Sequence, residues 1–257
     1  MNILEKIITD KRKEILKKKK NFPISFKEVK AREFKNQFSK ALKKEGTSII
    51  AEIKRKSPSA GTIREDFDHL MIAETYEKSG AAAISVLTDS KYFGGELSFI
   101  SDIKNKIKIP VLRKEFVIDE YQIYESAIAG ADAILLIVRA LTSKKLKKFV
   151  FIASELGLEP LVEAHSYEEL QIAIDSGCSI IGINNRNLDT MEVDLETSLK
   201  LIEKIPENFI KVSESGIHSY KEIKLLKNAG FDAFLIGESL MREKNPGKKL
   251  KALLEGK

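Results

Sequence analysis

Residues 48–54 read SIIAEIK, a short run of apolar and mostly β-branched residues that ends with an acid and a base. A nearly continuous apolar run of this length is typical of a strand in a parallel sheet that is covered on both faces. Side chains alternate along a strand, so Glu52 and Lys54 should lie on one face. The stretch therefore predicts a buried strand that carries two charged groups at its end.

Seven further runs of this kind follow, each separated from the next by room for a loop and a helix. They begin at Ala82, Ile109, Asp132, Glu159, Ser179, Ile210 and Asp232. Several intervening helices should end at a glycine, where positive φ costs little, namely at Gly80, Gly130, Gly177 and Gly230. Eight βα units predict an α/β fold, a (β/α)8 TIM barrel, because an open doubly wound sheet usually uses fewer strands. No Gly-x-Gly-x-x-Gly follows a run, which disfavours dinucleotide binding.

Residues 1–47 precede the repeat and predict an N-terminal helical extension. Two amphipathic helices, within residues 3–20 and 25–46, should be joined across Pro23 and should pack through Phe22, Phe26, Phe34 and Phe38. The run KRKEILKKKK, residues 11–20, predicts a solvated helix face, with attraction to RNA or a membrane as the alternative. The extension could cover either end of the barrel. We expect a single TIM-barrel domain over residues 1–257, with the extension at 1–47 and eight βα units at 48–257.

The composition is that of a globular protein, with 43% hydrophobic residues among 257 and a net charge of +6. This modest excess of bases favours an anionic ligand without requiring nucleic acid. Cys178 is the single cysteine, so we expect a buried structural thiol. No segment has the apolar core of a signal peptide or the ~18 apolar residues of a membrane span. We expect a cytoplasmic protein, without membrane association and without a second domain after Lys257.

The ends of the predicted strands carry mainly polar residues, and reactive groups of TIM barrels lie at these ends. They are Glu52, Lys54, Ser57, Lys114, Phe116, Glu163, Asn184, Arg186, Glu214, Ser215, Gly216, Gly237 and Glu238. Charges inside a barrel are costly unless they pair or serve a ligand. Any one of them could merely form a structural salt bridge. Their convergence on one end of the barrel favours a catalytic pocket.

The last two predicted strands add a signal for phosphate. SESGI, residues 213–217, and LIGESLM, residues 235–241, each place a glycine where backbone N–H groups could approach an anion. Loops after strands 7 and 8 bind phosphate in many TIM barrels. With Lys54, Ser57 and Arg186 nearby, this pattern predicts a phosphorylated small-molecule substrate.

A family resemblance runs through all eight units. The segments AEIKRKSPSAG (51–61), PVLRKEFVIDEYQIYES (110–126), LVEAH (161–165), IGINNRNL (181–188), VSESGI (212–217) and FLIGESLM (234–241) resemble indole-3-glycerol phosphate synthase in order and spacing. The resemblance implies tryptophan biosynthesis, with 1-(2-carboxyphenylamino)-1-deoxyribulose 5-phosphate converted to indole-3-glycerol phosphate, carbon dioxide and water. It also implies no metal or organic cofactor, and an N-terminal extension near the barrel mouth.

The resemblance further implies roles for the strand-end residues. Lys114 matches the general acid at the C2 carbonyl, and Glu163, Glu52 and Lys54 match the groups that move protons in dehydration, in an order the sequence leaves open. Asn184 and Glu214 match positioning residues. Substrate and phosphate binding is implied for Lys54, Ser57, Arg186, Ser215, Gly216, Gly237 and Glu238, the last through its N–H with its side chain pointing away. An anthranilate pocket is implied for Phe93, Phe116, Leu188 and either Leu135 or Leu136.

Two alternatives are another phosphate-binding barrel enzyme of amino-acid biosynthesis and, from a different class of protein, a nucleic-acid binder. Phosphoribosylanthranilate isomerase typically uses a Cys/Asp pair, whereas Cys178 precedes its predicted strand and is at the wrong end. A nucleic-acid binder that uses the N-terminal lysines leaves the buried acids unexplained. We expect a monomer, and weak association with other enzymes of the pathway stays open.

Overall fold

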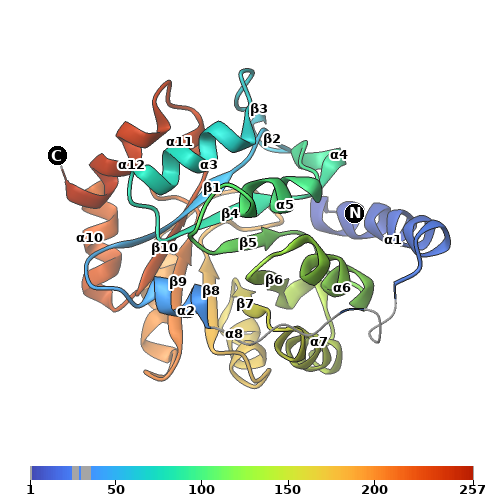
Figure 1. The fold of residues 1–257 in the computed structure, drawn as a ribbon. Helices are drawn as coiled ribbons and strands as arrows, with labels where there is room; N and C mark the ends of the chain where they lie inside the picture. Colours follow the sequence, from blue (N-terminus) through green and yellow to red (C-terminus); the bar gives the residue numbers. More distant parts are fainter. Residues whose placement is uncertain (1, 25–28, 30–35, 257) are drawn as a thin grey trace.

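A closed barrel is the centre of the computed structural model, which describes residues 2–24, 29 and 36–256 (Figure 1). In this described part, eight parallel strands close in the order β1-β10-β9-β8-β7-β6-β5-β4. They are β1 (Ser48–Ile53), β4 (Ala83–Leu87), β5 (Val111–Lys114), β6 (Ala133–Ile137), β7 (Glu159–Ala164), β8 (Ile180–Asn184), β9 (Ile210–Glu214) and β10 (Ala233–Ile236). The predicted (β/α)8 barrel is confirmed, and each strand lies in one of the eight predicted runs.

Helices surround the barrel and cover the outer face of its strands (Figure 1). They are α3 (His69–Lys78), α5 (Ser98–Lys104), α6 (Glu120–Ala129), α7 (Ser143–Glu155), α8 (Tyr167–Ile174), α9 (Glu196–Leu201), α10 (Tyr220–Ala229) and α12 (Pro246–Glu255). Shorter elements lie in the connections, namely β2 (Lys56–Ser57), β3 (Gly61–Thr62), α4 (Ser90–Phe93), η2 (Val138–Ala140), η3 (Ile202–Lys204) and α11 (Glu238–Met241). The four predicted helix-ending glycines all have positive φ.

The alternation of side chains separates two apolar regions. Ile50, Leu112 and Leu161 belong to a cluster inside the barrel, whereas neighbours such as Ile49 and Val111 pack between strands and helices. On several strands, the inward-facing residue two positions after an inner apolar side chain is charged. The inner face therefore changes from apolar to polar toward the C-terminal ends of the strands, because strand register brings these positions to one level.

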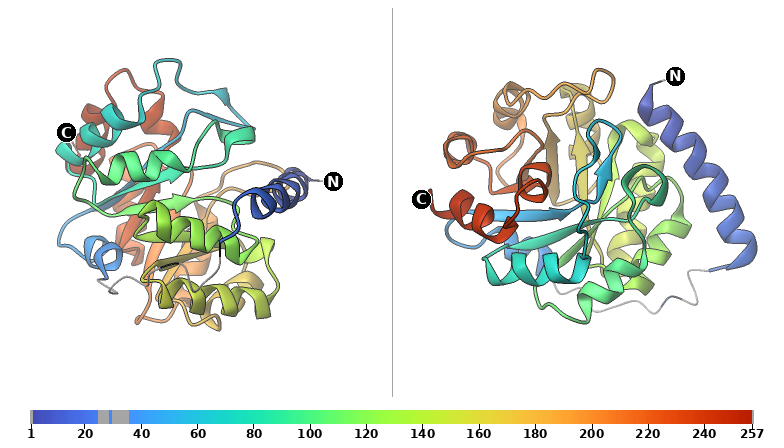
Figure 2. Two further views of the ribbon diagram at one scale, coloured as in Figure 1. Left: turned by 45° about the vertical axis from the view of Figure 1, so that its right-hand side comes forward. Right: turned by 90° about the horizontal axis from the view of Figure 1, so that it is seen from above.

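The N-terminal extension reaches both ends of the barrel. Helix α2 (Gln37–Leu42) closes the N-terminal end, where Phe38 packs in the inner cluster and its N–H donates to Glu159 Oε1 at 2.7 Å. Helix α1 (Ile3–Asn21) lies along one side of the barrel, as both views in Figure 2 show. Its start, capped by Asn2, lies at the opposite, C-terminal mouth.

The predicted packing residues of the extension have mixed outcomes. Phe38 is buried as predicted, but the prediction for Phe22 was wrong, since it is 70% exposed. Phe22 directly follows the end of α1, where its backbone oxygen accepts a hydrogen bond from Tyr121 while its side chain faces solvent. Phe26 and Phe34 lie outside the described residues.

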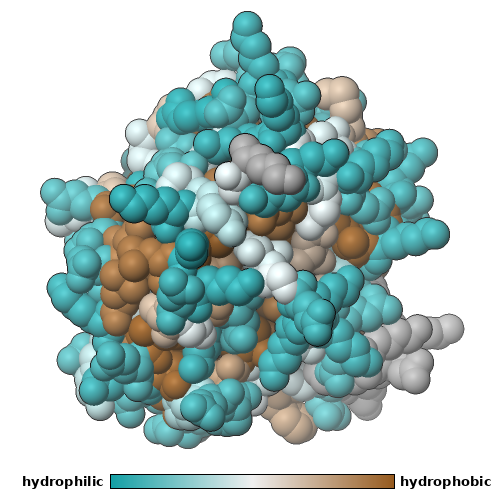
Figure 3. Space-filling view, turned by 90° about the vertical axis from the view of Figure 1, so that its left-hand side faces the viewer, coloured by the Kyte–Doolittle hydropathy of each residue, from teal (hydrophilic) through white to brown (hydrophobic). Residues whose placement is uncertain are grey.

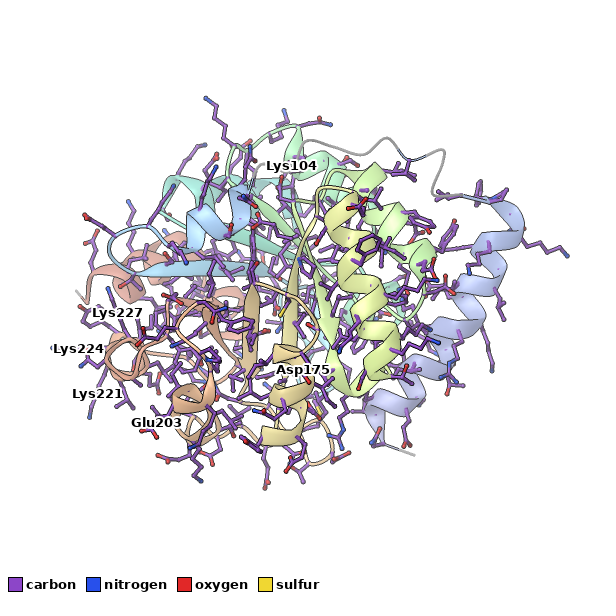
Figure 4. All side chains as sticks on the ribbon, turned by 90° about the horizontal axis from the view of Figure 1, so that it is seen from below. Lys104, Asp175, Glu203, Lys221, Lys224 and Lys227 are labelled. Atoms are coloured by element: carbon purple, nitrogen blue, oxygen red, sulfur yellow. The ribbon has the colours of Figure 1, made fainter. Side chains whose placement is uncertain are left out.

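The face drawn in Figure 3 is largely hydrophilic, and its apolar residues gather mainly on the left side of the view. Lys221, Lys224 and Lys227 project outward from α10, on the opposite side of the molecule from α1 (Figure 4). Basic residues are thus found on distant faces. Cys178 is buried, as predicted. Among the described helices, none is both long enough and apolar enough to cross a membrane.

Candidate active site

A cavity of about 430 Å³ opens at the C-terminal ends of the barrel strands. This volume lies within the range of roughly 300–1,000 Å³ typical of small-molecule sites. All the predicted site residues line the cavity except Glu214 and Leu136. Glu214 lies beneath the floor, and Leu136 points outward into the packing between strands and helices, so Leu135 is the pocket residue of that pair.

Lys114 occupies the centre of the floor, at the end of β5. Its Nζ donates a hydrogen bond to Glu214 Oε2 and lies 3.4 Å from Glu163 Oε2. The side chains of Glu163 and Glu214 are 2% and 0% exposed. One ammonium group therefore serves two carboxylates that come from different strands and have almost no access to water.

The two carboxyl groups in this cluster have pKa values shifted in opposite directions. Burial raises the pKa of Glu214 to about 7 and the negative charge of Glu163 adds to the rise, while Lys114 opposes it. Burial would also raise the pKa of Glu163, but Lys114 and His165 hold it below its usual range. Burial would lower the pKa of Lys114, yet the surrounding carboxylates raise it. Lys114 thus remains an ammonium group that can donate a proton or stabilise negative charge.

A second ion pair lies on β1 and just after it. Lys54 Nζ donates to Glu52 Oε1 at 2.6 Å, which confirms that the two side chains share a face. Burial would raise the pKa of Glu52, but Lys54 and Lys114 lower it. The two clusters are therefore electrostatically connected across the floor.

Two glycines make room for the buried carboxylates. A Cβ at Gly237 would overlap the carboxyl group of Glu52, and a Cβ at Gly182 would overlap that of Glu214. Gly237 has an ordinary φ of −127°, so the requirement there is space and not backbone conformation. The sequence analysis assigned Gly237 to anion binding alone and missed Gly182. A glycine two residues before the strand-end Asn184 was the available signal.

The predicted phosphate residues gather on one side of the cavity, from the loops after β1, β8, β9 and β10. Ser215 and Gly216 form a left-handed turn with φ of 67° and 79°. Arg186 Nη1 donates to Met191 O at 3.0 Å, and its Nη2 lies 3.7 Å from Glu238 Oε2. The prediction that the Glu238 side chain points away was wrong, because Arg186, Arg242 and Lys54 hold it among basic groups on this wall.

Arg242 also lines the cavity, and the sequence analysis missed it. Its Nη2 donates to Glu238 Oε1 at 2.8 Å. The signal was its place four residues after Glu238, since side chains four apart on a helix are neighbours.

The opposite side of the cavity is apolar. The rings of Phe93 and Phe116 are 6.0 Å apart and tilted by 37°. Leu135 and Leu188 line the same cavity, as predicted. Ile3, Leu4 and Ile7 of α1 complete the lining and were missed, although their helical spacing could have indicated a buried face.

A buried lysine attaches α1 to this apolar wall. Lys11 is 2% exposed, and its Nζ lies 2.8 Å from Asp89 Oδ2 and 3.2 Å from Glu115 Oε1. Asp89 Oδ1 accepts the N–H of Tyr92 at 2.6 Å at the start of α4, and Glu115 Oε1 accepts the N–H of Phe116 at 2.8 Å. The predicted solvated face was wrong for Lys11, because these distant carboxylates neutralise it inside the protein.

In the part of the chain that the structure describes, no group of three or more His, Cys, Asp and Glu residues is placed to hold a metal ion.

A model of the family described as indole-3-glycerol phosphate synthase matches residues 4–253. The chain belongs to this family. Membership in the family, and not the barrel fold, identifies the activity, because one fold hosts many functions.

Proteins that are similar in sequence carry the same name as the family. Indole-3-glycerol phosphate synthase of Thermoanaerobacter pseudethanolicus is 48% identical over 242 residues, which cover 93% of this chain and 92% of that protein. The enzyme of the same name from Campylobacter jejuni subsp. doylei is 52% identical over 223 residues, covering 86% of each chain. Thiamine phosphate pyrophosphorylase from Pyrococcus furiosus has a TM-score of 0.60 at 16% identity, over 80% of this chain and 93% of that one. The latter likeness concerns the fold alone.

Proposed function

We infer that the protein closes the indole ring in tryptophan biosynthesis. It converts 1-(2-carboxyphenylamino)-1-deoxyribulose 5-phosphate to indole-3-glycerol phosphate, with release of carbon dioxide and water, and is therefore a carboxy-lyase that acts on a phosphorylated small molecule. The match of the indole-3-glycerol phosphate synthase model over residues 4–253 carries this conclusion. The charged cavity supplies groups for each chemical step.

Ring closure needs an acid at the C2 carbonyl. As the aryl carbon that bears the carboxylate attacks C2, negative charge develops on the carbonyl oxygen and must be stabilised or protonated. We assign this role to Lys114, which lines the cavity and remains an ammonium group because buried carboxylates surround it. Loss of carbon dioxide then restores the aromatic ring.

Dehydration needs both an acid and a base. The C2 hydroxyl leaves as water and the ring loses a proton, so the proton count of the enzyme is unchanged over both events. Glu163, Glu52 and Lys54 are the proposed groups, with Glu214 and Asn184 as positioning residues. Glu163 and Glu52 both have lowered pKa values, which supports a carboxylate form at rest for each.

The two sides of the cavity suggest one substrate orientation. The anthranilate ring would lie against Phe93, Phe116, Leu135 and Leu188. The phosphate would face Lys54, Ser57, Arg186 and the backbone of Ser215, Gly216, Gly237 and Glu238. Their separation by the floor residues supports this orientation, because the reacting carbons lie between ring and phosphate in the substrate.

The direct experiment supplies the purified protein with the carboxyphenylamino-deoxyribulose phosphate and follows indole fluorescence without added metal or cofactor. Formation of indole-3-glycerol phosphate is expected, and its absence under conditions where the protein is folded would refute the proposal. A single domain, a monomeric state, a cytoplasmic location, the absence of a cofactor and the absence of nucleic-acid binding stay predictions.

A further inference from the structure

His165 lies directly behind the proposed reactive carboxylate Glu163, and no role has yet been given to it. It follows β7, and its side chain is 8% exposed. His165 Nε2 is 3.3 Å from Glu163 Oε1, while Lys114 approaches the other oxygen, Oε2, at 3.4 Å. The two oxygens of Glu163 therefore face two different basic groups, one in the cavity and one behind it.

Glu169 fixes the orientation of the His165 ring. Its Oε2 accepts the backbone N–H of His165 at 2.8 Å and lies 3.0 Å from Nδ1 of the ring. Because a carboxylate only accepts hydrogen bonds, Nδ1 must carry the proton in this contact. A neutral ring would then place an unprotonated Nε2 3.3 Å from Glu163 Oε1.

That arrangement favours a charged ring. Nε2 is buried without a hydrogen-bond partner, since its 3.3 Å contact with Glu163 lacks hydrogen-bond geometry. An unprotonated nitrogen beside a carboxylate oxygen is unfavourable, whereas an imidazolium at this distance forms an ion pair. Burial would lower the pKa of His165, but Glu169, Glu163 and Glu214 raise it.

The ionisable groups around the ring come from several elements. Besides Glu163 on its own strand, they are Glu169 on α8, Glu214 on β9 and Asp189 in the loop after β8. These four groups are acids, and the cations beside them are Arg139, which pairs with Asp189, and Lys114, which pairs with Glu163 and Glu214. Lys114 on β5 is the nearest described cation to Glu163 on the cavity side.

We propose that His165 is a positioning residue for Glu163, which holds Oε1 as an imidazolium and keeps Glu163 ionised with Oε2 directed at the cavity. The inference rests on the proposed function for the importance of Glu163 in turnover. It makes His165 and Glu169 part of the catalytic apparatus without contact with substrate. A purely structural histidine would contribute to folding but would not set the pKa of Glu163.

The matched substitutions separate charge from orientation. His165→Gln removes the charge but retains an amide that can approach Glu163. His165→Asn also removes the charge, and its shorter amide can replace only Nδ1, which faces Glu169. Both should raise the pKa of Glu163 by at least about one unit, because a nearby opposite charge lowers a carboxylate pKa by about 1–3 units. Glu169→Gln should raise it by a smaller amount, because His165 then loses its proton at lower pH. Glu168→Gln, an exposed neighbour in the first turn of α8, is the control.

Two measurements test the proposal. The carboxyl ¹³C resonance of Glu163, assigned with Glu163→Gln, is titrated by NMR in each variant, and single-turnover formation of the indole product is measured against pH. We expect the Glu163 titration and the corresponding limb of the rate profile to move to higher pH in His165→Gln, His165→Asn and Glu169→Gln. The single-turnover rate of His165→Asn should fall by about tenfold, less than the ~10²–10⁴-fold typical for loss of the acid–base group itself.

An unmoved Glu163 titration in folded His165→Gln and Glu169→Gln would overturn the proposal. So would a rate that falls equally at every pH. If one histidine variant does not fold, the other and Glu169→Gln still decide the question. Absence of product from the unmodified protein would refute the proposed function instead, whereas a productive enzyme with an unmoved titration would refute only the role of His165.

Discussion

Among the single residues, Lys114 contacts two carboxylates whose pKa values shift in opposite directions. Glu214 is completely buried and its pKa is raised to about 7, whereas the pKa of Glu163 is lowered. Glu163 has His165 on its far side as a second basic group, and Glu214 has no described hydrogen-bond partner at its Oε1. The difference explains how two similar side chains on one lysine can hold different protonation states near neutral pH.

The raised pKa of Glu214 predicts a pH-dependent stability. The folded protein holds a proton on Glu214 up to pH about 7, whereas the unfolded chain releases it near the usual pKa of 4.5. Between these values the folded state binds more protons, so this group lowers the free energy of unfolding as pH rises. Glu214→Gln removes that dependence. As pH rises from 5 to 8, the free energy of unfolding of the variant, measured in urea, should therefore increase relative to that of the unmodified protein.

The comparison of the two proteins at each pH is its own control, because all other groups titrate in both. A stability difference that stays constant from pH 5 to pH 8 would contradict the raised pKa. The opposite trend would show that Lys114 outweighs burial at this site.

Arg186 allows a separate test of the phosphate side. It lines the cavity, and its guanidinium donates a hydrogen bond to Met191 O. Hydrogen bonds to charged groups contribute about 1.5–3 kcal/mol, so Arg186→Ala should raise KM by roughly 10- to 100-fold with a smaller effect on kcat. Steady-state kinetics measure both constants. Arg12→Ala, on the exposed face of α1, is the control, and an unchanged KM in Arg186→Ala would exclude a role in binding.

At the scale of elements, α1 is joined to the cavity through buried charge. Lys11 contacts Asp89 and Glu115. Asp89 also accepts the backbone N–H of the residue before Phe93, and Glu115 accepts the backbone N–H of Phe116. Arg113 Nη2 is 3.8 Å from Glu115 and supplies a further positive charge there. The helix thus positions its own apolar residues and supports those of the barrel through one side chain.

Lys11→Met should destabilise the protein and weaken substrate binding together. Removing one partner of a buried ion pair costs about 3–5 kcal/mol, because the remaining charge is left uncompensated. Asp89 would lose its cation entirely among the contacts described, while Glu115 would keep Arg113. Urea unfolding measures the free energy, and steady-state kinetics measure the expected rise in KM.

Lys17→Met is the matched control, since Lys17 is exposed on the same helix. Its stability and KM should stay close to those of the unmodified protein. Equal stability of the Lys11 and Lys17 variants would show that the buried pairs do not hold α1 to the barrel.

At the scale of the whole molecule, the fold could be predicted because its signals are local. Each strand has a nearly continuous apolar run, and Gly130 and Gly230 end their helices with positive φ exactly where the chain must turn into the next strand. The charged cavity residues at the strand ends followed from position, since parallel strands place their C-terminal ends together. The positions of Glu52, Lys54 and Lys114 at the barrel mouth could therefore be predicted from the sequence. Phe93, Leu135 and Leu188 followed from the family resemblance.

The remaining features depend on contacts between distant parts of the chain. The sequence around Lys11 matches an exposed basic helix, and only Asp89 and Glu115, far along the chain, make it a buried residue. The space that Gly182 leaves for Glu214 depends on the register of β8 and β9, with Asn184 opposite Glu214. No local pattern contains that information.

The role of Lys114 as the acid in ring closure can be tested by comparing one variant with the unmodified protein. Purified Lys114→Ala and the unmodified protein are given the carboxyphenylamino-deoxyribulose phosphate, and indole fluorescence is followed, with the exposed Lys144→Ala as control. Turnover by Lys114→Ala should fall by about 10²–10⁴-fold while circular dichroism shows a folded barrel. Near-normal formation of indole-3-glycerol phosphate by that variant would contradict the account.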